Sequence, residues 1–268
     1  MTTLDPASLL PAVIRLAEIA GDDILAIYAR GPIAVTHKSD ASPVTAADLA
    51  AHRRIVAGLR ALTPTLPVVS EEGREPPDAA PHSEAFWLVD PLDGTYEFID
   101  RTGEFTVNIA LIEGGRPVLG VVNVPVHRVS YWGGVGLGAW RRRAGETQPQ
   151  AVRVVAPRRG GQPLRVVASK RYLTEATRAL IATLGPHETL QVGSSLKFCR
   201  IAEGEADVYP RLGPTSEWDT AAAQAVVEAA GGHVCTLQGE PLHYGKADIL
   251  NPDFVVSAVP LATLQQRA

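Results

Sequence analysis

An apolar strand pattern that runs directly into an acidic turn constrains this chain more than any other feature of its sequence. The segment FWLVD (86–90) is apolar up to its last residue, and the string DPLDGT begins at that same aspartate. A short apolar run bounded by Pro and Gly is typical of a buried strand. We expect this strand to end at Asp90, because Pro91 cannot donate to a sheet ladder and Gly94 permits a tight turn. The turn would bring Asp90 and Asp93 toward one point.

The acidic turn offers oxygen ligands of the kind that magnesium prefers. Asp90, Asp93 and the backbone carbonyl of Leu92 between them would present hard oxygen atoms to one cation. Two further acidic positions are Glu71, after another apolar stretch, and Asp219, in SEWDTAAAQAV. Four neighbouring carboxylates repel one another unless cations occupy the gap between them. A shared site for metal-assisted hydrolysis would explain all four.

Each acidic position also has a simple structural explanation when it is taken alone. The pattern Asp-Pro-x-Asp-Gly is ordinary turn chemistry, and Glu71-Glu72 has the pattern of a solvated loop. Asp219 precedes an alanine-rich helical segment and would serve as its N-cap. Asp48 stands three residues after Thr45, which predicts a capping box at the start of a helix. The residue patterns alone leave these alternatives open.

The first half of the chain combines helical segments with a predicted sheet. Apolar residues follow helical spacing over 8–28, where Gly21 is a point at which the helix could be interrupted. A second helix is expected to begin near Thr45. Apolar and β-branched runs at 105–112 and 117–124 flank a glycine pair and predict a β-hairpin. We therefore expect paired helices followed by a sheet.

The second half alternates strands with helices. A polar stretch over 141–161 separates it from the first half, and we place the boundary of two subdomains there, giving residues 1–155 and 156–268. The expected strands lie near 164–169, 188–192, 206–209, 233–237 and 254–258, and the expected helices near 174–184, 195–203 and 219–230. Together the two halves predict a layered α/β or α+β architecture.

Composition and charge exclude several classes of function. The chain has 268 residues and a formal net charge of −4, whereas proteins that bind nucleic acid polymers usually carry a basic excess. Cys199 and Cys235 form neither a Cys-x-x-Cys pair nor a zinc spacing. We find neither a secretory signal pattern nor an apolar stretch of the roughly 20 residues that a membrane span needs. The expected location is the cytoplasm, with peripheral membrane contact left open.

Several strings together resemble one superfamily of phosphatases. WLVDPLDGTYEF, with SEE upstream and WDTAA downstream, is similar to the inositol monophosphatase superfamily of lithium-sensitive, magnesium-dependent phosphatases. The resemblance spans nearly the whole chain. It implies an α+β fold of alternating layers, an α/β/α/β/α sandwich. It also implies that two or three Mg²⁺ ions assist the hydrolysis of a phosphate monoester.

The resemblance assigns a role to each residue that matches the motifs. Five residues match the metal ligands of the superfamily: Glu71, Asp90, Leu92 through its carbonyl, Asp93 and Asp219. Thr95 matches the hydroxyl that positions the attacking water, Asp48 in TAAD matches its acidic partner, and Glu71 also helps to hold the water. The backbone amides of Gly94 and Thr95 would hold phosphate oxygens. Glu71, Leu92, Asp93 and Asp219 would also lie against the bound phosphate.

A narrower resemblance indicates the substrate. SPVTAADLAAH, EFTVNIALIEGGRPVLGVV, GSSLKFC and YPRLGPTSEWDTAA are similar to the CysQ-type 3'(2'),5'-bisphosphate nucleotidases. Such enzymes hydrolyse adenosine 3',5'-bisphosphate to AMP and phosphate. On this resemblance Ser195, Lys197 and Arg211 would bind the substrate. A helix amino end with a lysine in its first turn favours anions, although a capped helix with a solvated lysine explains the same pattern.

The chain departs from the nucleotidase pattern at two places, and other functions stay open. Tyr96 stands where these nucleotidases commonly carry lysine, and in ASKRY (168–172) Tyr172 replaces the histidine of an SRSH-like stretch. An inositol-phosphate or sugar-phosphate phosphatase would use the same metal site. A non-catalytic nucleotide-binding or metal-binding regulator is a further alternative. We expect a small phosphorylated nucleotide as the substrate, and a monomer or a homodimer.

Overall fold

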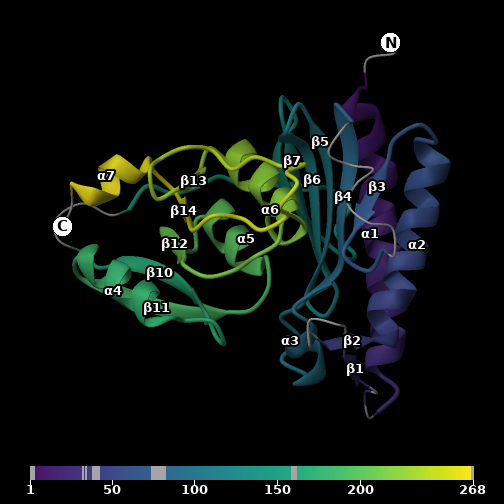
Figure 1. Cartoon of the computed structure of the whole chain (residues 1–268), viewed down its shortest axis with the longest axis horizontal. Coiled ribbons are helices and arrows are strands. Elements are labelled where there is room, and N and C mark those ends of the chain that lie inside the picture. The colour runs from purple at the N-terminus through teal and green to yellow at the C-terminus, as the bar shows by residue number, and fades with distance from the viewer. Residues whose placement is uncertain are drawn as a thin grey trace.

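The computed structural model describes residues 4–31, 33, 35–37, 43–73, 83–157 and 162–266. Two mixed sheets organise this part of the chain (Figure 1). The seven-stranded sheet has the order β3-β4-β5-β6-β7-β8-β9. Its strands are β3 (Val68–Ser70), β4 (Ala85–Asp93), β5 (Thr106–Glu113), β6 (Arg116–Val124), β7 (Val129–Gly134), β8 (Gly138–Arg143) and β9 (Gln150–Ala151). Apart from the parallel pair β3–β4, its neighbouring strands are antiparallel.

The second sheet has five strands in the order β11-β10-β12-β14-β13. They are β10 (Leu164–Ser169), β11 (His187–Val192), β12 (Val208–Arg211), β13 (His233–Thr236) and β14 (Phe254–Ser257). A small antiparallel pair, β1 (Val35–His37) and β2 (Pro43–Thr45), precedes the second helix. The strands expected in the second half of the chain are thus present.

Helices cover both sheets and fill the space between them. They are α1 (Pro6–Tyr28), α2 (Ala46–Leu62), α3 (Thr95–Ile99), α4 (Glu175–Thr183), α5 (Leu196–Ala202), α6 (Glu217–Ala229) and α7 (Leu261–Gln265). In Figure 1, α1 and α2 lie on the outer face of the seven-stranded sheet, α5 and α6 lie between the sheets, and α4 and α7 lie beyond the five-stranded sheet. This succession is the α/β/α/β/α sandwich that the sequence resemblance implied.

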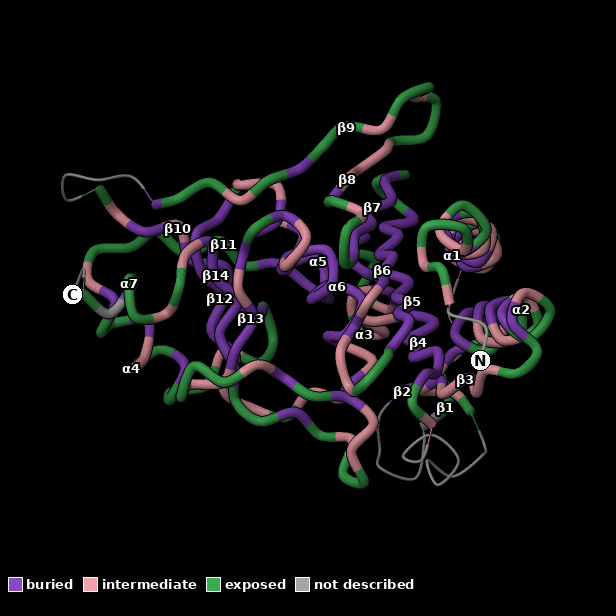
Figure 2. The backbone as a smooth tube through the Cα atoms, turned by 90° about the horizontal axis from the view of Figure 1, so that it is seen from above, coloured by how far each residue is buried: buried purple, intermediate pink, exposed green. Residues whose placement is uncertain are grey.

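Burial follows the layers. The elements buried most completely are the central strands of both sheets together with α5 and α6 (Figure 2). The outer helices bury one face only: α1 directs Val13, Ala17 and Ile24 into the core, as helical spacing predicts. No helix in the described ranges is both long enough and apolar enough to cross a membrane.

The first helix continues through Gly21 instead of breaking there. A Cβ atom at this position would lie 2.4 Å from the side-chain oxygen of Asn123 on β6. The glycine therefore allows α1 to approach the sheet closely. Tertiary packing, and not helix propensity, explains its presence inside the helix.

The predicted end of the strand at Asp90 is wrong, because β4 continues to Asp93. Asp90 pairs with Asn108 and Asp93 pairs with Thr106, and the register shifts between them. The irregularity accommodates Pro91, which has no N–H for the ladder, without ending the strand. The N–H of Leu92 donates to the Asp90 side chain at 3.0 Å. The acidic turn is therefore a bulge at the end of β4, which is paired on both sides.

The change from one sheet to the other falls between Ala151 and Leu164. The helix α6 comes from the second half of the chain, yet it packs against β5, β6 and β7 of the first. The layers of the two halves thus interlock, and the division into subdomains 1–155 and 156–268 stays a prediction.

Candidate active site

A cleft of about 690 Å³ opens where the end of β4, α3 and the first turns of α5 and α6 meet. Most of the predicted site residues line it: Glu71, Asp93, Gly94, Thr95, Ser195, Lys197, Arg211 and Asp219. Asp90 and Leu92 lie behind this lining, and each is only 1% exposed. The structure thus gathers residues from both halves of the chain around one space.

The four predicted acidic ligands interact electrostatically in every pair. Burial, followed by the charges of Glu71, Asp93 and Asp219, raises the pKa of Asp90 well above its ordinary value, and Asp90 also shares a hydrogen bond with Glu71. Burial and the charges of Asp93 and Glu71 likewise raise the pKa of Asp219 well above its usual range. Each ionised carboxylate therefore makes its neighbours harder to ionise.

Asp93 interacts with Lys197 as well as with the other carboxylates. Burial raises its pKa to about 6, the Lys197 charge opposes that shift, and the charges of Glu97 and Glu71 reinforce it.

This donor set fits Mg²⁺. Its side-chain ligands are all carboxylates, and a divalent cation would oppose the repulsion that raises the pKa values of Asp90, Asp93 and Asp219. Within the ranges that the structure describes, no three acidic, histidine or cysteine side chains already converge closely enough to hold an ion. The role of these residues as ligands stays a prediction that rests on their shared cleft and their coupling.

Asp48 links the start of α2 to the cleft. One of its oxygens accepts hydrogen bonds from the Thr45 N–H at 2.8 Å and the Thr45 hydroxyl at 2.6 Å, which confirms the predicted capping box. Its other oxygen accepts a hydrogen bond from the Thr95 hydroxyl at 3.3 Å. Asp48 is 1% exposed, and burial raises its pKa. Asp48 thus caps α2 with one oxygen and contacts Thr95 with the other.

Asp219 occupies the third position of α6 and not its N-cap. The helix begins at Glu217, two residues earlier than we expected, and the Ser216 N–H donates to the Asp219 carboxylate at 2.8 Å. The predicted N-cap role is therefore wrong, because Ser216 takes that position and Asp219 completes the capping box. This arrangement fixes the Asp219 carboxylate at the edge of the cleft.

Asp93 is anchored to the start of α5. Its carboxylate accepts a hydrogen bond from the Ser195 N–H, and also bonds from Thr106 at 3.4 Å and Asn108 at 3.5 Å. The Ser195 hydroxyl lies 2.8 Å from both the Thr106 hydroxyl and the Asn108 side-chain oxygen. Ser195 therefore connects β5 to the acidic bulge, in addition to lining the cleft.

Sequence reasoning missed Thr106 and Asn108. They lie in the apolar-looking string EFTVNIALIE, where buried polar residues at alternate positions of a strand were the available signal.

Glu97 is a further cleft residue that the sequence analysis did not single out. It lies in α3, and a Cβ atom at Gly94 would come within 3.1 Å of its carboxylate. Gly94 has a φ of 93°, a conformation that favours glycine, so this position has both a steric and a conformational reason to lack a side chain. The short turn from Gly94 into α3 places Thr95 against Asp48.

Two cations, Lys197 and Arg211, line the same cleft without ion-pair partners among the described residues. Lys197 is 7% exposed, donates to the Ser194 carbonyl at 2.6 Å and lies 5.4 Å from the centroid of the Tyr209 ring. Burial lowers its pKa to about 8, although the Asp93 charge opposes this shift. Arg211 is also 7% exposed and donates to the Pro214 carbonyl at 2.8 Å.

Apolar and aromatic side chains complete the cleft beyond the two cations. This part of the lining includes Tyr96, Tyr172, Phe198, Tyr209, Trp218, Ile249, Leu250 and Phe254. Such a mixture of aromatic surface and few charged groups is typical of a small-molecule site. The sequence analysis missed most of these residues because they come from segments that are far apart in the chain.

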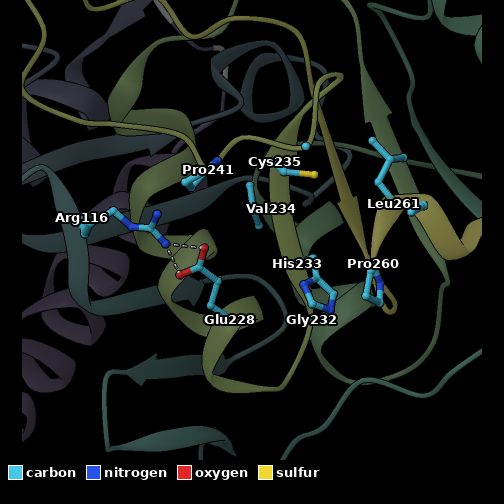
Figure 3. A pocket seen from close by; sticks show the side chains of 11 residues that line it. Arg116, Glu228, Gly232, His233, Val234, Cys235, Pro241, Pro260 and Leu261 are labelled. Atoms are coloured by element: carbon cyan, nitrogen blue, oxygen red, sulfur yellow. Dashed lines mark hydrogen bonds and ion pairs between the residues drawn. The ribbon is translucent and has the colours of Figure 1, made fainter.

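A second hollow of about 520 Å³ lies near β13 and α7 and carries none of the predicted site residues (Figure 3). Arg116 and Glu228 form an ion pair at its edge, with atoms 3.3 Å apart. His233 and Cys235 also line it. It holds no cluster comparable to the carboxylates and cations of the first cleft.

Comparison with known proteins places the chain in one family. The model of the inositol monophosphatase family matches residues 5–267. The chain is 50% identical over 253 residues to the 3'(2'),5'-bisphosphate nucleotidase CysQ of Escherichia coli strain K12, covering 93% of this chain and 99% of that protein. It is 49% identical over 251 residues to the CysQ of Salmonella typhimurium, with the same coverage.

A solved structure agrees with these relatives. The crystal structure of CysQ from Bacteroides thetaiotaomicron, described as a bacterial member of the inositol monophosphatase family, has a TM-score of 0.82 and 41% sequence identity. The match covers 94% of this chain and 98% of that one. The resemblance read from the motifs is thus confirmed across nearly the whole length, and the chain belongs to the inositol monophosphatase family.

Proposed function

We propose that the chain removes the 3'-phosphate of adenosine 3',5'-bisphosphate by magnesium-dependent hydrolysis, releasing AMP and phosphate. The observation that carries this proposal is that two chemically different groups of residues line one cleft. Glu71, Asp93, Thr95 and Asp219 form an acidic wall with a hydroxyl, and Lys197 and Arg211 supply cations beside aromatic surface. One phosphate held by the carboxylates through magnesium and a second held by the cations would match a nucleotide with two phosphates. The relatives at 50% identity carry the name of this nucleotidase activity, which supports the assignment.

The acidic wall would hold the scissile phosphate through magnesium. Glu71, Asp90, the Leu92 carbonyl, Asp93 and Asp219 would be the protein ligands, shared by two or three ions. Bound magnesium supplies Lewis-acid chemistry that polarises phosphoryl oxygens and acidifies water. The Ser195 N–H and Thr106 fix the Asp93 carboxylate in its orientation. Hydrogen bonds of this kind around a ligand hold it in place for the ion.

Thr95 and Asp48 would orient the attacking water. The Thr95 hydroxyl donates a hydrogen bond to Asp48. The lone pairs of the Thr95 oxygen are therefore available to accept a hydrogen bond from a water in the cleft. Asp48 is buried and held by Thr45 on its other oxygen, which limits its movement. Glu71 would accept a hydrogen bond from the second hydrogen of that water. The geometry supports general-base assistance by a positioned pair.

Lys197 and Arg211 would bind the remote phosphate. The 3'- and 5'-phosphates stand on different ribose carbons, so ligands of the scissile group cannot hold both. Lys197 stays mostly protonated at neutral pH, because its pKa is lowered only to about 8. The binding energy of the remote phosphate can then orient the scissile phosphate against the acidic wall.

A substrate panel tests the proposal. Phosphate release is measured with adenosine 3',5'-bisphosphate, inositol 1-phosphate and fructose 1,6-bisphosphate, each with Mg²⁺ and with EDTA. Fastest turnover of the nucleotide supports the proposal. Faster turnover of inositol 1-phosphate would assign the chain to the other activity on the same site, and absence of any magnesium-dependent release would favour a non-catalytic regulator. The cytoplasmic location and the monomer or homodimer stay predictions.

A further inference from the structure

Arg211 is held in an arrangement that leaves one buried donor without a partner. Its guanidinium has five N–H donors. A terminal nitrogen donates to the Pro214 carbonyl at 2.8 Å, while Nε is buried and makes no hydrogen bond. Buried polar atoms without partners are rare in folded proteins and call for an explanation. Because Arg211 lines the cleft, a bound acceptor such as a phosphate oxygen would satisfy this donor.

The Arg211 guanidinium lies over the ring of Tyr172. The central carbon is 5.1 Å from the ring centroid, within the range of cation–π attraction. Tyr172 also lines the cleft, although it is 52% exposed. The Arg211 guanidinium is thus fixed at two places, by a carbonyl at its end and by the Tyr172 ring.

The segment that carries Tyr172 is tied to its surroundings through the residues that precede it. The Tyr172 N–H donates to the Ser169 hydroxyl at 3.1 Å. The preceding residue, Arg171, forms an ion pair with Asp100 and lies 4.6 Å from the Tyr96 ring centroid. Lys170 forms an ion pair with Glu104 at 2.8 Å. These contacts restrain the backbone, so the Tyr172 ring is a supported platform and not a loose surface side chain.

We propose that Tyr172 is a positioning residue that sets the selectivity of the enzyme for substrates with a second phosphate. Its ring holds the Arg211 guanidinium in place at the cleft, where Nε makes no hydrogen bond to the protein. This inference rests on the proposed function, since it assigns Arg211 to the phosphate remote from the reaction. Tyr172 acts on that phosphate through Arg211, and its hydroxyl has no part in the role.

The test compares adenosine 3',5'-bisphosphate with adenosine 3'-monophosphate, which has the same scissile bond and lacks the 5'-phosphate. Tyr172→Ala should raise KM for the bisphosphate by about tenfold, which corresponds to ~1.4 kcal/mol. That loss is within the range of a partly desolvated cation–π contact. The kcat for the bisphosphate should change little, and KM for the monophosphate should rise much less than KM for the bisphosphate. Tyr172→Phe keeps the ring and should restore most of the bisphosphate affinity.

A matched control and a double variant complete the test. Leu190, on β11, is also 52% exposed and does not line the cleft. Leu190→Ala should therefore leave kcat and KM unchanged for both substrates. Arg211→Gln should raise KM for the bisphosphate, and adding Tyr172→Ala to it should cause little further loss.

Three results would overturn the inference. The first is an equal rise in KM for both substrates in Tyr172→Ala. The second is a rise in KM for the bisphosphate in Tyr172→Phe as large as in Tyr172→Ala, and the third is additive rises in KM in the double variant. Each of them leaves the proposed function intact if the parent enzyme cleaves the bisphosphate efficiently. A parent enzyme without bisphosphate activity would instead refute the proposed function itself. The thermal unfolding of each variant shows whether the fold is retained.

Discussion

The hydroxyl of Thr95 donates a hydrogen bond to the carboxylate of Asp48 at 3.3 Å, although the two residues are 47 positions apart in the chain. Asp48 belongs to the first turn of α2 on the outer face of the seven-stranded sheet, and Thr95 begins α3 beside the cleft. The contact therefore connects the outermost helical layer to the candidate active site. It also explains why a charged residue in a helix cap is almost fully buried.

Removal of this pair should affect the chemical step. Thr95→Ala should lower kcat far more than it raises KM, because the hydroxyl orients the water and does not bind the substrate. Loss of a positioned general-base unit typically costs about 10²–10⁴-fold in rate. Asp48→Asn should act in the same direction, and the double variant should be no worse than the poorer single variant. Steady-state kinetics measure kcat and KM for each variant. A change confined to KM in Thr95→Ala would contradict this role.

The acidic wall should be tested through its magnesium requirement. Asp93→Asn keeps the size of the side chain and removes one negative charge, so activity should fall by about two orders of magnitude or more and half-maximal activity should need more Mg²⁺. A titration of activity against Mg²⁺ concentration measures both effects. Glu240→Gln, at an exposed position outside the cleft, is the matched control. Near-normal turnover of Asp93→Asn at the parent's Mg²⁺ concentration would exclude Asp93 as a ligand.

Lys197 should contribute to the binding of the second phosphate. Lys197→Ala should reduce kcat/KM for adenosine 3',5'-bisphosphate by at least about tenfold, or ~1.4 kcal/mol, and should matter much less for adenosine 3'-monophosphate. Lys197→Met retains most of the buried aliphatic volume, so it separates the loss of charge from the loss of packing. If Lys197→Met lowers kcat/KM equally for both substrates, the lysine charge serves the reaction or the fold and not the binding of the remote phosphate.

Gly21 should be sensitive to a single added methyl group. Gly21→Ala would place a Cβ atom 2.4 Å from the buried side-chain oxygen of Asn123, whose amide already donates to Ser130 at 3.0 Å. We expect a loss of about 1–3 kcal/mol in the free energy of unfolding, as for other overpacked positions. Gly58→Ala is the control, because its new Cβ would meet the movable end of Leu16. Denaturant unfolding compares the two, and a Gly21→Ala variant as stable as Gly58→Ala would contradict this packing.

The family and the layered fold could be predicted from the sequence because they depend on local signals. The string around Asp90 identified the family, helical spacing located α1, and Thr45 with Asp48 marked the start of α2. The helices and strands of the second half were also recognised near their observed positions. Caps, turns and apolar periodicity act within a few residues, so a single sequence reveals them.

The details that were wrong or missed depend on contacts between distant segments. The strand passes Asp90 because β5 continues to pair beyond Pro91, and the sequence of β4 alone does not show its partner. Ser195 anchors Asp93 through a bond that joins residues 102 positions apart. The stacking of Arg211 on Tyr172 likewise joins two segments that are adjacent only in the folded chain. Such pairings arise from the tertiary structure and carry no local signature.

The central claim is that the enzyme hydrolyses a doubly phosphorylated nucleotide in this cleft with the help of magnesium. The most direct test measures phosphate release by the parent enzyme from adenosine 3',5'-bisphosphate, with Mg²⁺ and with EDTA, beside inositol 1-phosphate under the same conditions. The account predicts rapid release from the nucleotide with AMP as the other product, loss of activity in EDTA, and a higher kcat/KM than for inositol 1-phosphate. Release that persists in EDTA, or a higher kcat/KM for inositol 1-phosphate, would contradict it.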